Sequence, residues 1–128
     1  MSPARILVVD DNLTNLKLAV DVLEFEGYEV LRAQNAEEAQ ALVKRSPPNL
    51  ILMDIQMPGM DGLTLTRKLK AEPTTRDIPI VAMTSFAMKG DEQKARDAGC
   101  DGYVTKPIDT RKLTGQVAEF LERDKMKR

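Results

Sequence analysis

Five short apolar runs alternate with amphipathic stretches along this chain, and that alternation constrains the fold more than any other feature. The runs stand at residues 6–9, 28–31, 50–53, 80–83 and 103–104. The first, third and fourth contain only apolar residues, which is typical of parallel strands covered on both faces. The second contains Glu29 and the fifth is very short, so we expect both at the edges of a sheet.

Apolar residues recur at helical spacing between these runs. The marking residues are Leu16, Val20 and Leu23; Ala36, Ala39 and Val43; Leu65 and Leu69; and Leu113, Val117, Phe120 and Leu121. The stretch 91–98 has little more than Ala95 and Ala98 as its apolar face, so we expect it to be the least firmly anchored helix. Five strand–helix units predict one α/β domain, built on a doubly wound five-stranded parallel sheet.

Composition excludes several classes of function. The 128 residues include no histidine, so this chain has no imidazole base, no histidine metal ligand and no phosphohistidine of its own. The single cysteine forms no internal disulfide, which indicates a reducing, cytoplasmic compartment. A net charge of −1 argues against nucleic acid and anionic membranes as partners. No apolar run approaches the roughly 20 residues that span a bilayer, and we expect no signal peptide.

Polar residues follow the apolar runs at the edge where sheets of this class bind ligands. They are Asp10 and Asp11 after the first run, Asp54 after the third, Thr84 after the fourth, and Thr105, Lys106 and Pro107 after the fifth. Taken singly, Asp11 or Asn12 could cap a helix, and Asp54 could begin a turn. Thr84 could also be a cap, and Lys106 a solvated charge. Together, three carboxylates that repel one another favour a hard cation with few protein ligands, such as Mg²⁺.

The sequence resembles a receiver domain of the response regulators of two-component signalling over nearly its whole length. The resemblance rests on Ile6-Leu7-Val8-Val9-Asp10-Asp11, Leu52-Met53-Asp54-Ile55-Gln56-Met57-Pro58-Gly59-Met60-Asp61-Gly62, Thr84-Ser85 and Lys106-Pro107, in this order. It implies a flavodoxin-like (βα)5 fold with strand order 2-1-3-4-5. Residues 1–123 would form the receiver domain, and 124–128 a charged tail or the start of a linker. The run 86–91 resembles the single-domain cell-division regulators of this family.

The resemblance implies a phosphoacceptor and its metal ligands. Asp54 would attack a phosphohistidine on a sensor histidine kinase or histidine phosphotransferase and become an aspartyl phosphate. Asp10, Asp11, Asp54 and the backbone carbonyl of Gln56 would hold Mg²⁺. The missing histidine fits this interpretation, because the partner supplies the imidazole. Such a domain modifies only itself, by phosphotransfer and autodephosphorylation, so we do not expect an enzyme.

The resemblance also implies how the phosphoryl group is bound and sensed. Lys106 would pair with the phosphoryl oxygens and Thr84 would hydrogen-bond to them. A cis bond before Pro107 would aim the lysine inward. Thr84 and Tyr103 would act as the switch, Tyr103 turning inward to repack the face formed by the last two helices and the strand between them. The alternative for Tyr103 is an ordinary half-buried strand aromatic. We expect a downstream protein as target, and a monomer or weak homodimer.

Some residues near the site allow two interpretations. Gln56 and Phe86 stand at positions that vary in the family; Phe86 would either limit access of the hydrolytic water or serve as a docking residue. In the turn 58–62 the glycines permit positive φ, and Asp61 is expected to cap the following helix rather than bind metal. Cys100 is expected to be a packing residue rather than a redox switch.

Three other classes of protein compete with the receiver interpretation. A flavodoxin would need a hydroxyl- and glycine-rich phosphate loop where this chain has Asp10 and Asp11, which would repel a flavin phosphate. A haloacid-dehalogenase-like phosphatase would need a second acid at position 56, where glutamine stands. A binding module that ignores phosphorylation would leave the complete set of acids, hydroxyl and lysine unexplained.

Overall fold

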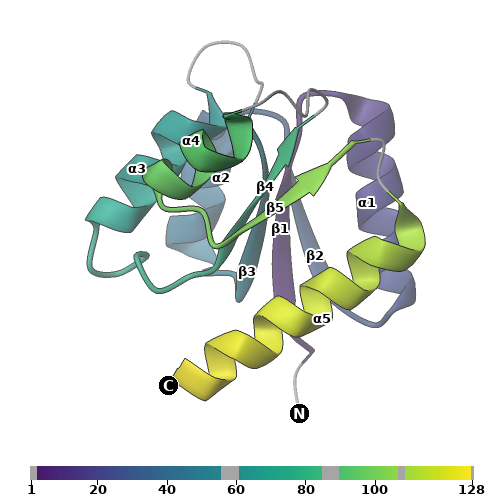
Figure 1. The fold of residues 1–128 in the computed structure, drawn as a ribbon. Coiled ribbons are helices and arrows are strands. Elements are labelled where there is room, and N and C mark those ends of the chain that lie inside the picture. Colours follow the sequence, from purple (N-terminus) through teal and green to yellow (C-terminus); the bar gives the residue numbers. More distant parts are fainter. Residues whose placement is uncertain (1–2, 56–60, 85–89, 107–108, 128) are drawn as a thin grey trace.

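The computed structural model describes residues 3–55, 61–84, 90–106 and 109–127, in which five strands alternate with five helices (Figure 1). In chain order the elements are β1 (Arg5–Val9), α1 (Leu13–Phe25), β2 (Glu29–Ala33), α2 (Ala36–Arg45), β3 (Leu50–Asp54), α3 (Gly62–Ala71), β4 (Ile80–Thr84), α4 (Asp91–Ala98), β5 (Gly102–Thr105) and α5 (Thr110–Lys127). Each predicted strand and helix is present.

The five strands form one parallel sheet with the order β2-β1-β3-β4-β5. This order confirms the predicted topology and places β2 and β5 at the edges. β1 lies between β2 and β3, so that Val9 stands opposite both Ala33 and Met53. The ends of β1 and β3 are therefore neighbours, which brings together the residues that follow them.

All five strands extend beyond their predicted bounds, β2 and β5 by two residues each and the other three by one. β2 runs to Ala33, because Arg32 and Ala33 pair with Val8 and Val9 of the central strand. β5 likewise includes Gly102 and Thr105. Pairing uses backbone groups, so a strand continues through polar residues that contribute nothing to an apolar pattern.

The helices cover both faces of the sheet (Figure 1). On one face α1 and α5 pack against alternate strand residues, and the buried set there includes Ile6, Val8, Leu50, Leu52, Val81 and Met83. On the other face α2, α3 and α4 pack against Leu7, Val9, Ile51, Met53, Ile80 and Ala82. Central strands buried on both sides explain why their sequences are continuously apolar rather than alternating.

Side chains cap the first turn of four helices, and for α5 the cap is Asp109, whose Oδ1 accepts from the N–H groups of Arg111 and Lys112 at 3.0 and 3.3 Å. Asn12 caps α1 by accepting a 3.0 Å hydrogen bond from the backbone N–H of Asn15. The sequence allowed either Asp11 or Asn12 as the cap of α1, and this hydrogen bond shows that Asn12 is the cap. Asp11 is therefore available for another role. Asp61 caps α3, as predicted, accepting from the N–H of Thr64 at 2.8 Å. Asn35 caps α2 in the same way.

α4 is held to the sheet by small side chains. Ala95 and Ala98 are its buried apolar residues. The helix begins after Gly90, which provides no side-chain cap. A Leu or Val on this face would bury far more apolar area. These observations agree with the prediction that this helix is weakly anchored.

α5 is 18 residues long and continues through Lys127. The division into a domain at 1–123 and a tail at 124–128 stays a prediction. In the part of the chain that the structure describes, no helix has both the length and the apolar character needed to cross a membrane.

Candidate functional site

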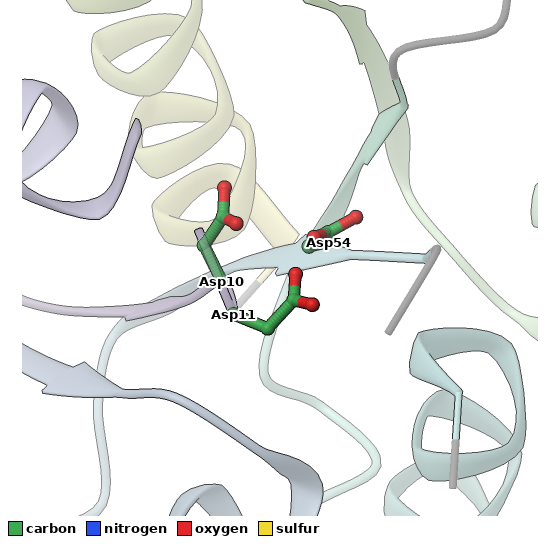
Figure 2. A group of neighbouring side chains, drawn as sticks. All are labelled: Asp10, Asp11 and Asp54. Carbon is green, nitrogen blue, oxygen red and sulfur yellow. The ribbon is translucent and has the colours of Figure 1, made fainter. Parts of the chain in front are cut away.

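Three carboxylates gather where β1 and β3 end (Figure 2). Asp10 and Asp11 directly follow β1, and Asp54 is the last residue of β3. One carboxylate oxygen from each residue lies within 4.8 Å of the others. Asp10 and Asp54 are buried, whereas Asp11 is exposed. The sheet thus holds two of the acids in a fixed place, and the third faces solvent.

Asp10 is held by the backbone around it. Its own N–H donates to the carbonyl of Ala33 at 3.0 Å, and its Oδ1 accepts from the N–H of Asn12 at 2.9 Å. Its Oδ2 is buried and accepts no hydrogen bond of regular geometry from the described residues. That oxygen nevertheless has the Nζ of Lys106 2.7 Å away. Asp10 therefore has one oxygen committed to the backbone and one available to a cation.

Lys106 joins the two buried acids. Its Nζ is 2.7 Å from Asp10 and 3.3 Å from Asp54, and its side chain is only 7% exposed. The N–H of Lys106 donates to the carbonyl of Thr84 at 2.7 Å, which fixes the base of the side chain beside β4. At such low exposure the ammonium is weakly screened, so its attraction for the carboxylates is stronger than at a surface.

The acids fit a divalent metal ion. Among the described residues, the ammonium of Lys106 pairs with two of the three carboxylates, which leaves an excess of negative charge at the site. Hard oxygen donors are the ligands that Mg²⁺ and Ca²⁺ prefer. The buried Oδ2 of Asp10 also lacks a regular hydrogen bond among the described residues. The exposed position of Asp11 leaves room for the water ligands that Mg²⁺ retains.

Thr84 and Tyr103 lie on neighbouring strands. Thr84 is buried at the end of β4, next to the strand that carries Asp54. Tyr103 is half-buried on the edge strand β5, where it pairs with Ala82 and packs against the core beneath α2, α3 and α4. Thr84 shares the edge of the sheet with the acids, and Tyr103 connects β5 to the layer that contains α4.

The sequence also singled out Gln56, Phe86, Pro107 and the glycines of the turn 58–62. Gln56, Phe86 and Pro107 lie outside the described residues, so their roles stay predictions. Gly62 does not use the positive φ that a glycine permits, because its φ is not positive. Gly62 is needed for space instead: a Cβ there would lie 2.2 Å from the carbonyl oxygen of Asp54. A local sequence pattern contains no signal for this contact, because it depends on how α3 returns to the sheet.

Comparisons with known proteins agree with this architecture. Residues 6–118 match the family model of the response regulator receiver domain. The polar-differentiation response regulator DivK of Brucella anthropi is 43% identical over 119 residues, covering 93% of this chain and 97% of that protein.

Solved structures give the same result. A CheY-like response regulator receiver domain protein from Methanospirillum hungatei superposes with a TM-score of 0.92 at 33% identity, covering 99% of this chain and 100% of that one. The signal receiver domain of a signal transduction histidine kinase from Syntrophus aciditrophicus has a TM-score of 0.85 at 33% identity, covering 93% and 90%.

Proposed function

This chain belongs to the response regulator receiver domain family, and from that premise we propose that it accepts a phosphoryl group on Asp54 and changes its protein contacts as a result. The donor is a phosphohistidine on a sensor histidine kinase or histidine phosphotransferase. The target is a downstream protein. The Brucella relatives are response regulators of polar differentiation, and we extend that class of signalling role to this chain.

One observation carries the proposal. The carboxylate of Asp54 is buried at the end of a central strand, 3.3 Å from the ammonium of Lys106 and beside the carboxylates of Asp10 and Asp11. A structural aspartate needs neither a buried lysine nor two further acids. A phosphoryl acceptor needs both, because charge accumulates on the transferred group and must be neutralised by groups already in place.

The transfer step is a displacement at phosphorus. An oxygen of Asp54 forms the new O–P bond while the P–N bond to the donor imidazole breaks. The electron pair of that bond stays on the imidazole, which a proton on its other ring nitrogen leaves neutral. The products are an aspartyl phosphate and a free histidine. In this proposal Lys106 neutralises the equatorial oxygens, and Thr84 donates a hydrogen bond to one of them.

The metal in this proposal is Mg²⁺. When bound, it supplies positive charge at the phosphoryl oxygens. Asp10, Asp11 and Asp54 would hold it, with the backbone carbonyl of Gln56 as a further ligand. Because the chemistry ends on its own side chain, the chain is a self-modifying switch and not an enzyme that turns over a separate substrate.

Intact-protein mass spectrometry tests the acceptor role. Wild-type protein incubated with phosphoramidate and Mg²⁺ is expected to gain one phosphoryl group, and Asp54→Asn protein none. Asp61→Asn is the matched control, because it removes one acid near the site and asparagine still caps α3. Chelation of divalent cations is expected to prevent the gain in wild-type protein. Equal phosphorylation of wild-type and Asp54→Asn protein would contradict the proposal.

The output face is proposed to be α4, β5 and α5. Tyr103 on β5 packs toward the layer of α4, and α4 buries only small apolar side chains. A change at Thr84 can therefore reach a helix whose displacement breaks few contacts. Amide chemical shifts should move in these three elements on phosphorylation. Unchanged shifts there, or target binding that is the same for Asp54→Asn and phosphorylated protein, would favour a module that ignores phosphorylation.

A further inference from the structure

We propose that Gly62 is a positioning residue for the phosphoacceptor. Because Gly62 has no side chain, the first turn of α3 lies directly against the backbone of Asp54 and fixes the place of its carboxylate. This inference rests on the proposed function, since the effect it assigns to Gly62 is on transfer to Asp54.

Space, and not backbone conformation, makes glycine necessary at this position. A Cβ on Gly62 would lie 2.2 Å from the carbonyl oxygen of Asp54 and 2.8 Å from the Cα of Ile55, where real Cβ contacts below 3.0 Å essentially never occur. The φ of Gly62 is not positive, so alanine can adopt its conformation. The obstructing atoms are backbone, and no side-chain rotation removes them. One methyl group therefore forces one of the two segments to move.

The first turn of α3 is firmly held. Asp61 caps it through the N–H of Thr64 at 2.8 Å, and the hydroxyl of Thr66 donates to the carbonyl of Gly62 at 2.8 Å. Leu65, one turn after the cap, is completely buried in the core. These two hydrogen bonds lie within the helix and its cap, so they keep the first turn rigid and the turn moves only with the helix. Moving the helix outward would expose Leu65 and Leu69, which it buries.

The other side of this contact is the end of β3, where strand pairing stops. Asp54 is the last residue of the strand, and beyond it the N–H of Ile55 donates to the carbonyl of Met83 at 3.1 Å. We therefore expect a methyl group at Gly62 to displace the Asp54–Ile55 peptide. The carboxylate of Asp54 stands 3.3 Å from Lys106, so a shift of this peptide changes the distances on which transfer depends.

The test compares phosphorylation rates at saturating phosphoramidate and Mg²⁺, corrected for the folded fraction. Gly62→Ala is expected to lower the rate roughly 10- to 100-fold, the effect of a displacement of up to about 1 Å. Gly115→Ala is the matched control, because a Cβ on this exposed residue of α5 meets nothing within 4 Å, and it should keep the wild-type rate. Val43→Ala in α2 should lower stability without changing the rate of the folded protein.

The outcomes separate positioning from stability. If Gly62→Ala does not fold, the double variant with Gly115→Ala is used, since alanine stabilises an exposed helix position. A wild-type rate, or failure of both variants to fold, would overturn the inference, because Gly62 would then serve stability alone. Absence of phosphorylation in both wild-type and Gly115→Ala protein would overturn the proposed function, and this inference with it.

Discussion

At the scale of single residues, the site depends on which side chains stand at the ends of strands. Asp10, Asp11, Asp54 and Lys106 could be predicted as neighbours because parallel strands end at one edge of the sheet. The contacts between these side chains could not be predicted from the sequence. The double ion pair of Lys106 depends on how β5 pairs with β4 and on the direction that the lysine side chain takes, which no local pattern specifies. The exposure of Asp11 beside two buried acids likewise required the structure.

Cys100 gives a prediction at the same scale. Burial raises the pKa of its thiol above the ordinary value of 9.0, and the hydrogen bond to Thr66 offsets this only in part. Because the thiolate is the reactive form, the folded protein holds less of it at pH 8 than a free cysteine does. Iodoacetamide should therefore alkylate Cys100 much more slowly in native protein than in protein unfolded by guanidinium. Equal rates in the two states would show that Cys100 is not shielded by the fold.

At the scale of elements, the sheet was predictable and the ties between helices and loops were not. Lys70 near the end of α3 donates to the carbonyl of Ile78 at 2.8 Å and pairs with Asp101 at 3.0 Å. Asp101 also accepts from the N–H of Ile80 at 2.8 Å. This network joins α3, β4 and the segment before β5. Its members are far apart in the sequence, so no periodicity indicates them.

Because α4 packs on the sheet through small side chains, we expect it to open locally more often than α2. Amide protons in α4 should exchange with deuterium faster than those of α2, which has a side-chain cap at Asn35 and buries Val43. Hydrogen exchange followed by mass spectrometry on peptides from the two helices measures the difference. Protection of α4 equal to that of α2 would contradict weak anchoring and would remove the physical basis of the proposed output face.

At the scale of the whole molecule, the net charge of the chain is close to zero although its candidate site is strongly acidic. The net charge of −1 says nothing of three carboxylates within 4.8 Å of one another. The apolar pattern was sufficient to predict a doubly wound parallel sheet of five strands, whereas the strand order β2-β1-β3-β4-β5 was predicted only through the resemblance to the receiver family. The family and the shared strand-end edge then located the acids. The contact of Gly62 with Asp54 emerged only from the assembled structure.

The acidic site predicts that Mg²⁺ stabilises the folded protein. A ligand that binds only the native state at 100 times its Kd raises the free energy of unfolding by about 2.7 kcal/mol. Urea denaturation with and without MgCl₂ at constant ionic strength measures this gain. Asp11→Asn should reduce the gain, because a proposed ligand is lost, whereas Asp77→Asn, at an exposed position between α3 and β4, should keep it. An undiminished gain in Asp11→Asn protein would exclude Asp11 from the metal site.

If Asp54 is the phosphoryl acceptor, the modified residue of the phosphorylated protein must lie at position 54. Phosphorylated protein is reduced with borohydride, which converts an aspartyl phosphate to homoserine, and the peptides are sequenced by mass spectrometry. We expect homoserine at position 54 and aspartate at positions 10 and 11. Homoserine at position 10 or 11, or at no position, would contradict the acceptor role of Asp54.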